Sequence, residues 1–88
     1  MGGPPAMTLV LLTWTDARDH GEPWASAADA AAFSAAPSLI RSTGFLVSKT
    51  DNFVTLGGDL DETDQSWGRL TKVPTGMVKE LRVVYEGD

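Results

Sequence analysis

Short apolar runs, broken by glycine, proline and polar clusters, recur along the chain and are typical of β-strands. In the first run, residues 8–17, Val10, Leu12 and Trp14 share one face of the predicted strand. Leu9 begins the opposite face, which is also apolar. Because a strand with two apolar faces needs cover on both, we expect one face to line a barrel interior and the other to meet another segment or a second subunit.

The later apolar runs predict four further strands, over residues 38–48, 53–56, 67–73 and 78–85. Residues 49–52 have the composition of a tight turn, so residues 45–56 are predicted to form a β-hairpin. Gly44 indicates a bend or a bulge within the second strand. Pro74 has no amide hydrogen to donate, and it predicts a single 3₁₀-like turn over residues 74–77. Residues 59–65 are predicted to form an exposed acidic loop.

Residues 18–37 do not follow the strand pattern. Ser26, followed three residues later by an aspartate, predicts a helix N-terminus, and the alanine-rich residues 27–36 have high helix propensity. An isolated helix of two to three turns is marginal in water. We therefore expect Trp24 and Phe33 to dock this helix on the rest of the protein.

These elements predict an all-β fold: a small, strongly bent, five-stranded barrel with one short α-helix inserted after the first strand. The 88 residues, 42% of them hydrophobic, suffice for one domain with one core. We expect a disordered tail over residues 1–7 and a barrel over residues 8–86, with residues 18–37 as the insertion. The chain has no cysteine, which excludes disulfides and thiolate metal sites. It shows no secretory signal and no membrane-spanning run, so a cytoplasmic location is expected.

Three segments of this chain resemble a group of short bacterial and bacteriophage proteins of unassigned function. They are Val-Leu-Leu-Thr-Trp-Thr-Asp at residues 10–16, the hairpin over residues 44–56, and Val-Pro-Thr-Gly-Met-Val-Lys-Glu-Leu at residues 73–81. The resemblance implies an Sm-like or Src-homology-3-like barrel, and it brings no known catalytic residues. The hairpin is also similar to that of Sm proteins. Thr75 stands where Sm proteins carry a basic residue before the closing glycine, so the resemblance does not extend to their RNA site.

Twelve acidic and seven basic residues give a formal charge of −5. Because nucleic-acid binding draws much of its affinity from neutralised phosphates, this balance disfavours it. The alternative is a local basic surface near the C-terminus, formed by Arg69, Lys72, Lys79 and Arg82.

Three tryptophans are the main candidates for a ligand or partner site, because tryptophan is enriched at interfaces. Trp14 and Asp16 lie on one side of the first strand, and Trp24 and Trp67 could extend this surface. The simpler interpretation is a tryptophan at the rim of the core and an aspartate that caps a turn.

Asp16, His20 and Glu22 are a weak candidate for a divalent-metal site, since one histidine and two carboxylates could bind zinc or manganese. A polar loop at the end of a strand explains the same residues, and no metal or other cofactor is expected.

We therefore predict a non-enzymatic, phage-like accessory protein. It would act by self-assembly into a homo-oligomer, by binding a protein or small ligand, or by both. Nucleic-acid binding through the four basic residues named above is the alternative.

Overall fold

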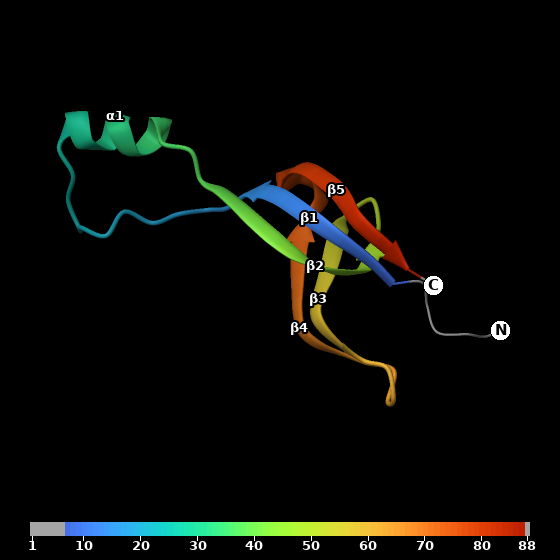
Figure 1. The fold of residues 1–88 in the computed structure, drawn as a ribbon. Coiled ribbons are helices and arrows are strands. Elements are labelled where there is room, and N and C mark those ends of the chain that lie inside the picture. The colour runs from blue at the N-terminus through green and yellow to red at the C-terminus, as the bar shows by residue number, and fades with distance from the viewer. Residues whose placement is uncertain (1–6, 88) are drawn as a thin grey trace.

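The computed structural model describes residues 7–87, which form five antiparallel strands in one sheet and one α-helix (Figure 1). In chain order the elements are β1 (Met7–Thr15), α1 (Ala27–Ala35), β2 (Leu39–Lys49), β3 (Phe53–Asp61), β4 (Ser66–Pro74), the 3₁₀ helix η1 (Thr75–Met77) and β5 (Val78–Gly87). The strand order is β4-β3-β2-β1-β5, so β4 and β5 are the edges of the sheet. The predicted all-β class is confirmed for residues 7–87.

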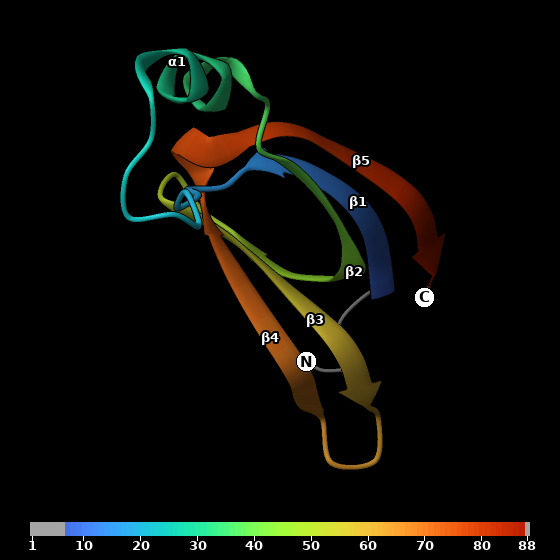
Figure 2. The same ribbon diagram turned by 90° about the vertical axis from the view of Figure 1, so that its left-hand side faces the viewer.

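Strand β2 bends the sheet, because its two halves pair with different neighbours. Residues 39–45 pair with β1, and residues 45–49 pair with β3. Gly44 lies at this change of partner, where an added Cβ would come within 2.8 Å of the Gly57 carbonyl oxygen. Glycine therefore allows the two backbones to approach closely. Figure 2 shows β2 curving between the pair β1 and β5 and the pair β3 and β4.

The core lies between the two halves of the bent sheet. Among residues 7–87, the buried hydrophobic side chains are Val10, Leu12, Val54, Leu56 and Val73, with Trp14, Leu46, Val78 and Leu81 packed around them. Val10 and Leu12 are both 0% exposed, as the alternation along β1 predicts. Each such side chain stabilises the fold by roughly 1.5–3 kcal/mol relative to an exposed one.

The hairpin of β3 and β4 is longer than the sequence suggests. Leu60 pairs with Trp67, and the Arg69 side chain holds Asp59, with Nε 2.8 Å from Oδ2. The strand pairs continue through Asp61 opposite Ser66, so the prediction of a loop over residues 59–61 was wrong. The turn is confined to residues 62–65.

The prediction that Met7 belongs to the disordered tail is wrong, because Met7 begins β1 opposite Gly87. The rest of that tail, residues 1–6, lies outside the described residues. No helix within residues 7–87 is long and apolar enough to cross a membrane.

Residues 16–38 form an arm between β1 and β2. Its two ends meet where the Asp16 N–H donates to the Ser38 carbonyl oxygen at 3.0 Å, which prolongs the β1–β2 ladder. Helix α1 begins as predicted, because the Ser26 hydroxyl accepts a hydrogen bond from the Asp29 N–H at 3.1 Å. The arm projects along the long axis of a structure that measures 59 × 22 × 21 Å (Figure 1).

The arm does not pack on the sheet. Within residues 7–87, no residue of α1 is buried. Trp24 is 89% exposed and Phe33 is 37% exposed. The predicted docking of these two side chains on the rest of the protein was therefore wrong: the β1–β2 ladder carries the arm away from the sheet before α1 begins.

Candidate functional site

Trp14 and Asp16 take the simpler roles that the sequence allows. Trp14 is half-buried at the rim of the core, and its Nε1–H donates to the Ser42 hydroxyl at 3.1 Å. The Asp16 carboxylate accepts a hydrogen bond from the Ala17 N–H at 2.8 Å. Both groups thus satisfy hydrogen bonds at the end of β1, where the arm begins.

The other two tryptophans lie in different parts of the molecule. The Trp67 ring on β4 packs beside Phe45, with ring centroids 5.8 Å apart, and covers Gly57, where an added Cβ would be 2.7 Å from the ring. Trp24 belongs to the arm. No contact among the rings of Trp14, Trp24 and Trp67 is found in the described structure, so they do not form one aromatic surface.

The candidate metal ligands are also separate. The Glu22 N–H donates to Nδ1 of His20 at 3.3 Å, and the His20 ring meets the Phe33 ring edge-on at 5.4 Å between centroids. Within residues 7–87, no three histidine, aspartate or glutamate side chains are placed to hold a metal ion. Asp16, His20 and Glu22 therefore do not form a metal site in this structure. His20 instead contacts two other residues of the arm, Glu22 and Phe33.

The four basic candidates divide between the two edge strands. Arg69 and Lys72 lie on β4, and Lys79 and Arg82 lie on β5, at opposite ends of the strand order. Both β4 residues already have partners. Arg69 is paired with Asp59, and the Lys72 Nζ lies 4.4 Å from the centre of the Phe53 ring.

Arg69 has a left-handed backbone, with φ of 52°. This conformation costs a residue other than glycine about 1–2 kcal/mol. Its guanidinium lies against Gly58, where a Cβ would be 2.9 Å from Cζ. The hydrogen bond that Arg69 donates is the larger cause that lowers the pKa of Asp59, and the positive charge of Arg69 is the smaller cause. The same contact raises the pKa of Arg69. Both side chains are exposed, so solvent screens the pair.

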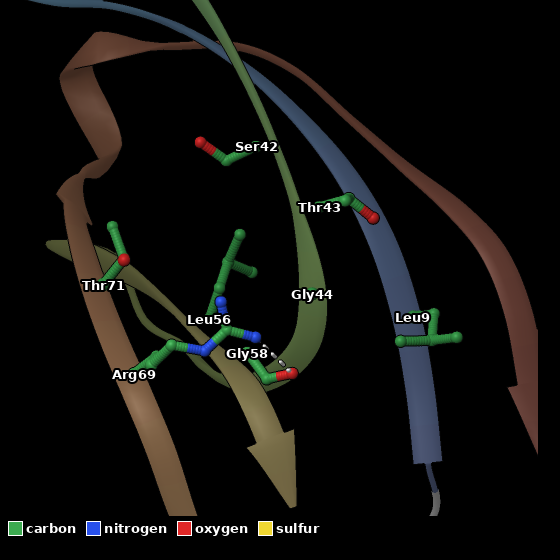
Figure 3. A pocket seen from close by; sticks show the side chains of 8 residues that line it. All are labelled: Leu9, Ser42, Thr43, Gly44, Leu56, Gly58, Arg69 and Thr71. Atoms are coloured by element: carbon green, nitrogen blue, oxygen red, sulfur yellow. Dashed lines mark hydrogen bonds between the residues drawn. The ribbon is translucent and has the colours of Figure 1, made fainter.

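A pocket of about 550 Å³ opens between the two halves of the bent sheet (Figure 3). The described residues that line it are Leu9, Ser42, Thr43, Gly44, Leu56, Gly58, Arg69 and Thr71. Arg69 is the one charged residue in this set, and the hydroxyls come from β2 and β4. The lining offers hydrogen-bond donors to a small ligand. It contains no side chain whose ordinary pKa is near neutrality, and the sole histidine of the chain lies in the arm.

This pocket is not apparent from the sequence. Its residues come from strands far apart in the chain, and only the bend at Gly44 and the Gly57-Gly58 pair hint at close backbone approach there. No residue pattern around Arg69 indicates its left-handed backbone.

Four exposed apolar residues lie outside both the pocket and the arm: Leu39 and Ile40 at the start of β2, Phe53 at the start of β3, and Met77 in η1. Leu39 and Ile40 are consecutive in β2, so their side chains face opposite sides of the sheet. Thr15 links two of them, because it pairs with Leu39 and its hydroxyl donates to the Met77 carbonyl oxygen at 3.3 Å. Phe53 pairs with Pro74, which directly precedes η1.

Comparison with protein-family models, with curated proteins and with solved structures finds no match to this chain.

Proposed function

We propose that this chain is a non-enzymatic, phage-like accessory protein that acts by self-assembly or by binding a protein or small ligand. One observation carries the proposal: within residues 7–87, five hydrophobic side chains are buried, whereas ten large ones are exposed. Single exposed apolar residues are ordinary, but contiguous apolar patches mark interaction sites. Here the exposed residues include Trp24 and Phe33 in the arm, Leu39 and Ile40 at the start of β2, and residues 83–85 of β5.

The proposed fold type is a small Sm-like or Src-homology-3-like barrel. The strongly bent sheet, its antiparallel order and the single turn of η1 before the last strand all support it. The resemblance of residues 10–16, 44–56 and 73–81 to short bacterial and bacteriophage proteins supports the phage-like character.

The chemistry of the pocket supports binding rather than catalysis. A hydrolase needs a nucleophile with an adjacent base, or a metal-bound water. Ser42, Thr43 and Thr71 supply hydroxyls, but no general base lies among the residues that line the pocket. His20, the one imidazole of the chain, is engaged within the arm by Glu22 and Phe33.

Sedimentation velocity from low to high micromolar concentration tests this proposal, together with acrylamide quenching of Trp24. We expect a mass above that of one chain and a Trp24 that becomes less accessible as concentration rises. A monomer at every concentration, with Trp24 shielded throughout, would contradict the proposal, because one chain would then cover its own apolar surface. Retention of a labelled oligonucleotide at low salt would instead favour the nucleic-acid alternative.

A further inference from the structure

We propose that the pocket between the two halves of the sheet binds a small hydroxylated carboxylate, with Arg69 as the group that holds the carboxylate. This inference rests on the proposed function, because it names the class of small ligand that the pocket would take. Three observations carry it: the fixed position of the Arg69 guanidinium, two hydroxyls that face the same hollow, and the burial of Leu56.

The Arg69 guanidinium is held on one side and free on the other. Its Nε donates to Asp59 Oδ2 at 2.8 Å, and its Nη2 donates to Asp59 Oδ1 at 3.3 Å and to the Gly58 carbonyl oxygen at 3.4 Å. Within residues 7–87, Nη1 donates no hydrogen bond. A guanidinium carries five N–H groups in a rigid plane, so the two on Nη1 remain for a ligand. Figure 3 shows the side chain extending from β4 into the hollow.

The surroundings of Arg69 leave room for its guanidinium. At Gly58 an added Cβ would lie 2.9 Å from Cζ, so a larger residue there would displace the group. The Arg69 backbone is left-handed, with φ of 52°. A residue other than glycine keeps such a conformation only where its surroundings impose it, and such residues cluster at functional sites. The hairpin therefore carries backbone strain at the one residue whose charged side chain lines the pocket.

Two hydroxyl side chains face the same hollow from different strands. Ser42 pairs with Leu12, and Thr71 pairs with Leu56. Both leucines are buried, and paired residues project to the same face, so the two hydroxyls lie on the core side of the sheet. The Ser42 oxygen accepts a hydrogen bond from Trp14 Nε1 at 3.1 Å, which leaves the hydroxyl hydrogen to donate. The hollow therefore offers hydrogen-bond donors from both β2 and β4.

These groups select a ligand by its charge and its polarity. A guanidinium matches the geometry of a carboxylate, and no acidic residue is among the described residues that line the pocket. Leu56 is only 3% exposed, and Figure 3 shows Leu9 pointing away from Arg69, so a hydrocarbon chain finds little apolar surface. The volume of about 550 Å³ is typical of small-molecule sites. A carboxylate with a hydroxylated body fits this lining better than a fatty acid or a neutral polyol.

Titration of the full-length chain with three probes at matched ionic strength tests this inference. Gluconate carries a carboxylate and a hydroxylated body, sorbitol has the body without the carboxylate, and hexanoate has the carboxylate without the hydroxyls. Two-dimensional NMR follows the Arg69 Nε–H and the backbone amides of Gly44 and Gly58 in the pocket. The Trp14 indole N–H reports on Ser42, because it donates to that hydroxyl.

We expect gluconate to shift these signals with a millimolar dissociation constant. Sorbitol and hexanoate should bind at least about tenfold more weakly, since each lacks one of the two groups that the pocket recognises. The amide signal of Gly21, which lies in the arm, should not move with any probe.

Two variants and a matched control locate the binding. Arg69→Gln removes the charge and should weaken gluconate binding by about tenfold or more. Gly58→Ala keeps the charge but displaces the guanidinium, and it should weaken binding as well. The control, Lys72→Gln, removes one positive charge from the same strand, where Nζ lies over the Phe53 ring outside the pocket lining. The control should bind gluconate as the natural chain does, and circular dichroism verifies that each variant is folded.

The outcomes separate this inference from the proposed function. Equal binding of sorbitol and gluconate would overturn the carboxylate and leave small-ligand binding in place, whereas equal binding of hexanoate would overturn the hydroxylated body. If Lys72→Gln weakens binding as much as Arg69→Gln does, gluconate responds to general charge and the site is wrong. If no probe shifts the pocket signals at tens of millimolar, the Asp59–Arg69 pair only links the hairpin and the inference fails. Sedimentation tests self-assembly independently of all these results.

Discussion

The sheet and the arm differ in where their apolar residues lie: the sheet buries some of them in a core, whereas no residue of α1 in the arm is buried. Six of the nine residues of α1 are alanine, which favours a helix but brings little surface to bury. The sheet has branched side chains such as Val10, Leu12 and Val54, which meet across the bend and are excluded from water. Local propensity therefore specifies the arm, whereas long-range burial specifies the sheet. A high apolar content by itself does not make a core.

The largest expected effect contrasts a core side chain of the sheet with an aromatic side chain of the arm. Leu12→Ala should lower the free energy of unfolding by about 2–5 kcal/mol, because it removes buried methyl groups and leaves a cavity. Phe33→Ala should change it by less than about 0.5 kcal/mol when measured at low concentration, since the ring packs on no strand. Urea denaturation followed by circular dichroism measures both. Equal losses of unfolding free energy in the two variants would show that the arm unfolds cooperatively with the sheet.

Glycines in the two regions should respond differently to an added methyl group. In Gly44→Ala the new Cβ meets the Gly57 carbonyl oxygen at 2.8 Å, so backbone must move, and we expect a loss of about 1–3 kcal/mol. Gly21 in the arm has no atom within 4 Å of such a Cβ. Gly21→Ala should be neutral or stabilise by up to about 1 kcal/mol through the unfolded state. The same urea denaturation compares the two variants. A loss of stability in Gly21→Ala would show that Gly21 packs against other residues of the single chain.

The sequence predicted those features that depend on neighbouring residues. The Ser26 cap, the turn over residues 49–52 and η1 after Pro74 all follow from local chemistry, and the structure confirms them. A bend or a bulge at Gly44 was predicted from the isolated glycine in an apolar strand, and the structure has the bend.

Features that depend on distant partners were missed. Residues 59–61 look like loop in sequence, and only pairing with β4 makes them strand. The position of the arm follows from the last pairs of the β1–β2 ladder, which no local pattern in residues 16–38 encodes. The predicted aromatic surface failed for the same reason: three tryptophans in one short chain say nothing about which strands bring them together.

The sheet and the arm also differ in backbone strain, with a smaller expected effect on stability than the changes above. Among residues 7–87, the non-glycine residues with positive φ are Gln65, at 55°, and Arg69, and both lie in the β3–β4 hairpin. Gln65→Gly should therefore stabilise the protein by about 0.5–1 kcal/mol, the relieved strain being offset in part by the greater freedom of glycine in the unfolded chain. Thermal unfolding at low concentration measures the gain. The Gln65 side-chain Nε2–H donates to the Glu62 carbonyl oxygen at 2.6 Å. An unchanged or lower melting temperature would mean that this hydrogen bond stabilises the protein at least as much as the backbone strain destabilises it.

The smallest expected effect is the pH dependence of the Asp59–Arg69 pair, the ion pair that joins the strands of that hairpin. Because the pKa of Asp59 is lowered in the folded state, its contribution is fully present above the ordinary aspartate pKa of about 3.9. The contribution is lost as the pH falls through the lower, folded-state pKa. Arg69→Gln should therefore be slightly less stable than the natural chain at neutral pH and equally stable in strong acid. An NMR titration that follows the Asp59 carboxyl carbon measures the pKa of Asp59 directly. In Arg69→Gln this pKa should rise toward the ordinary aspartate value. An unchanged pKa would show that solvent fully screens the exposed pair.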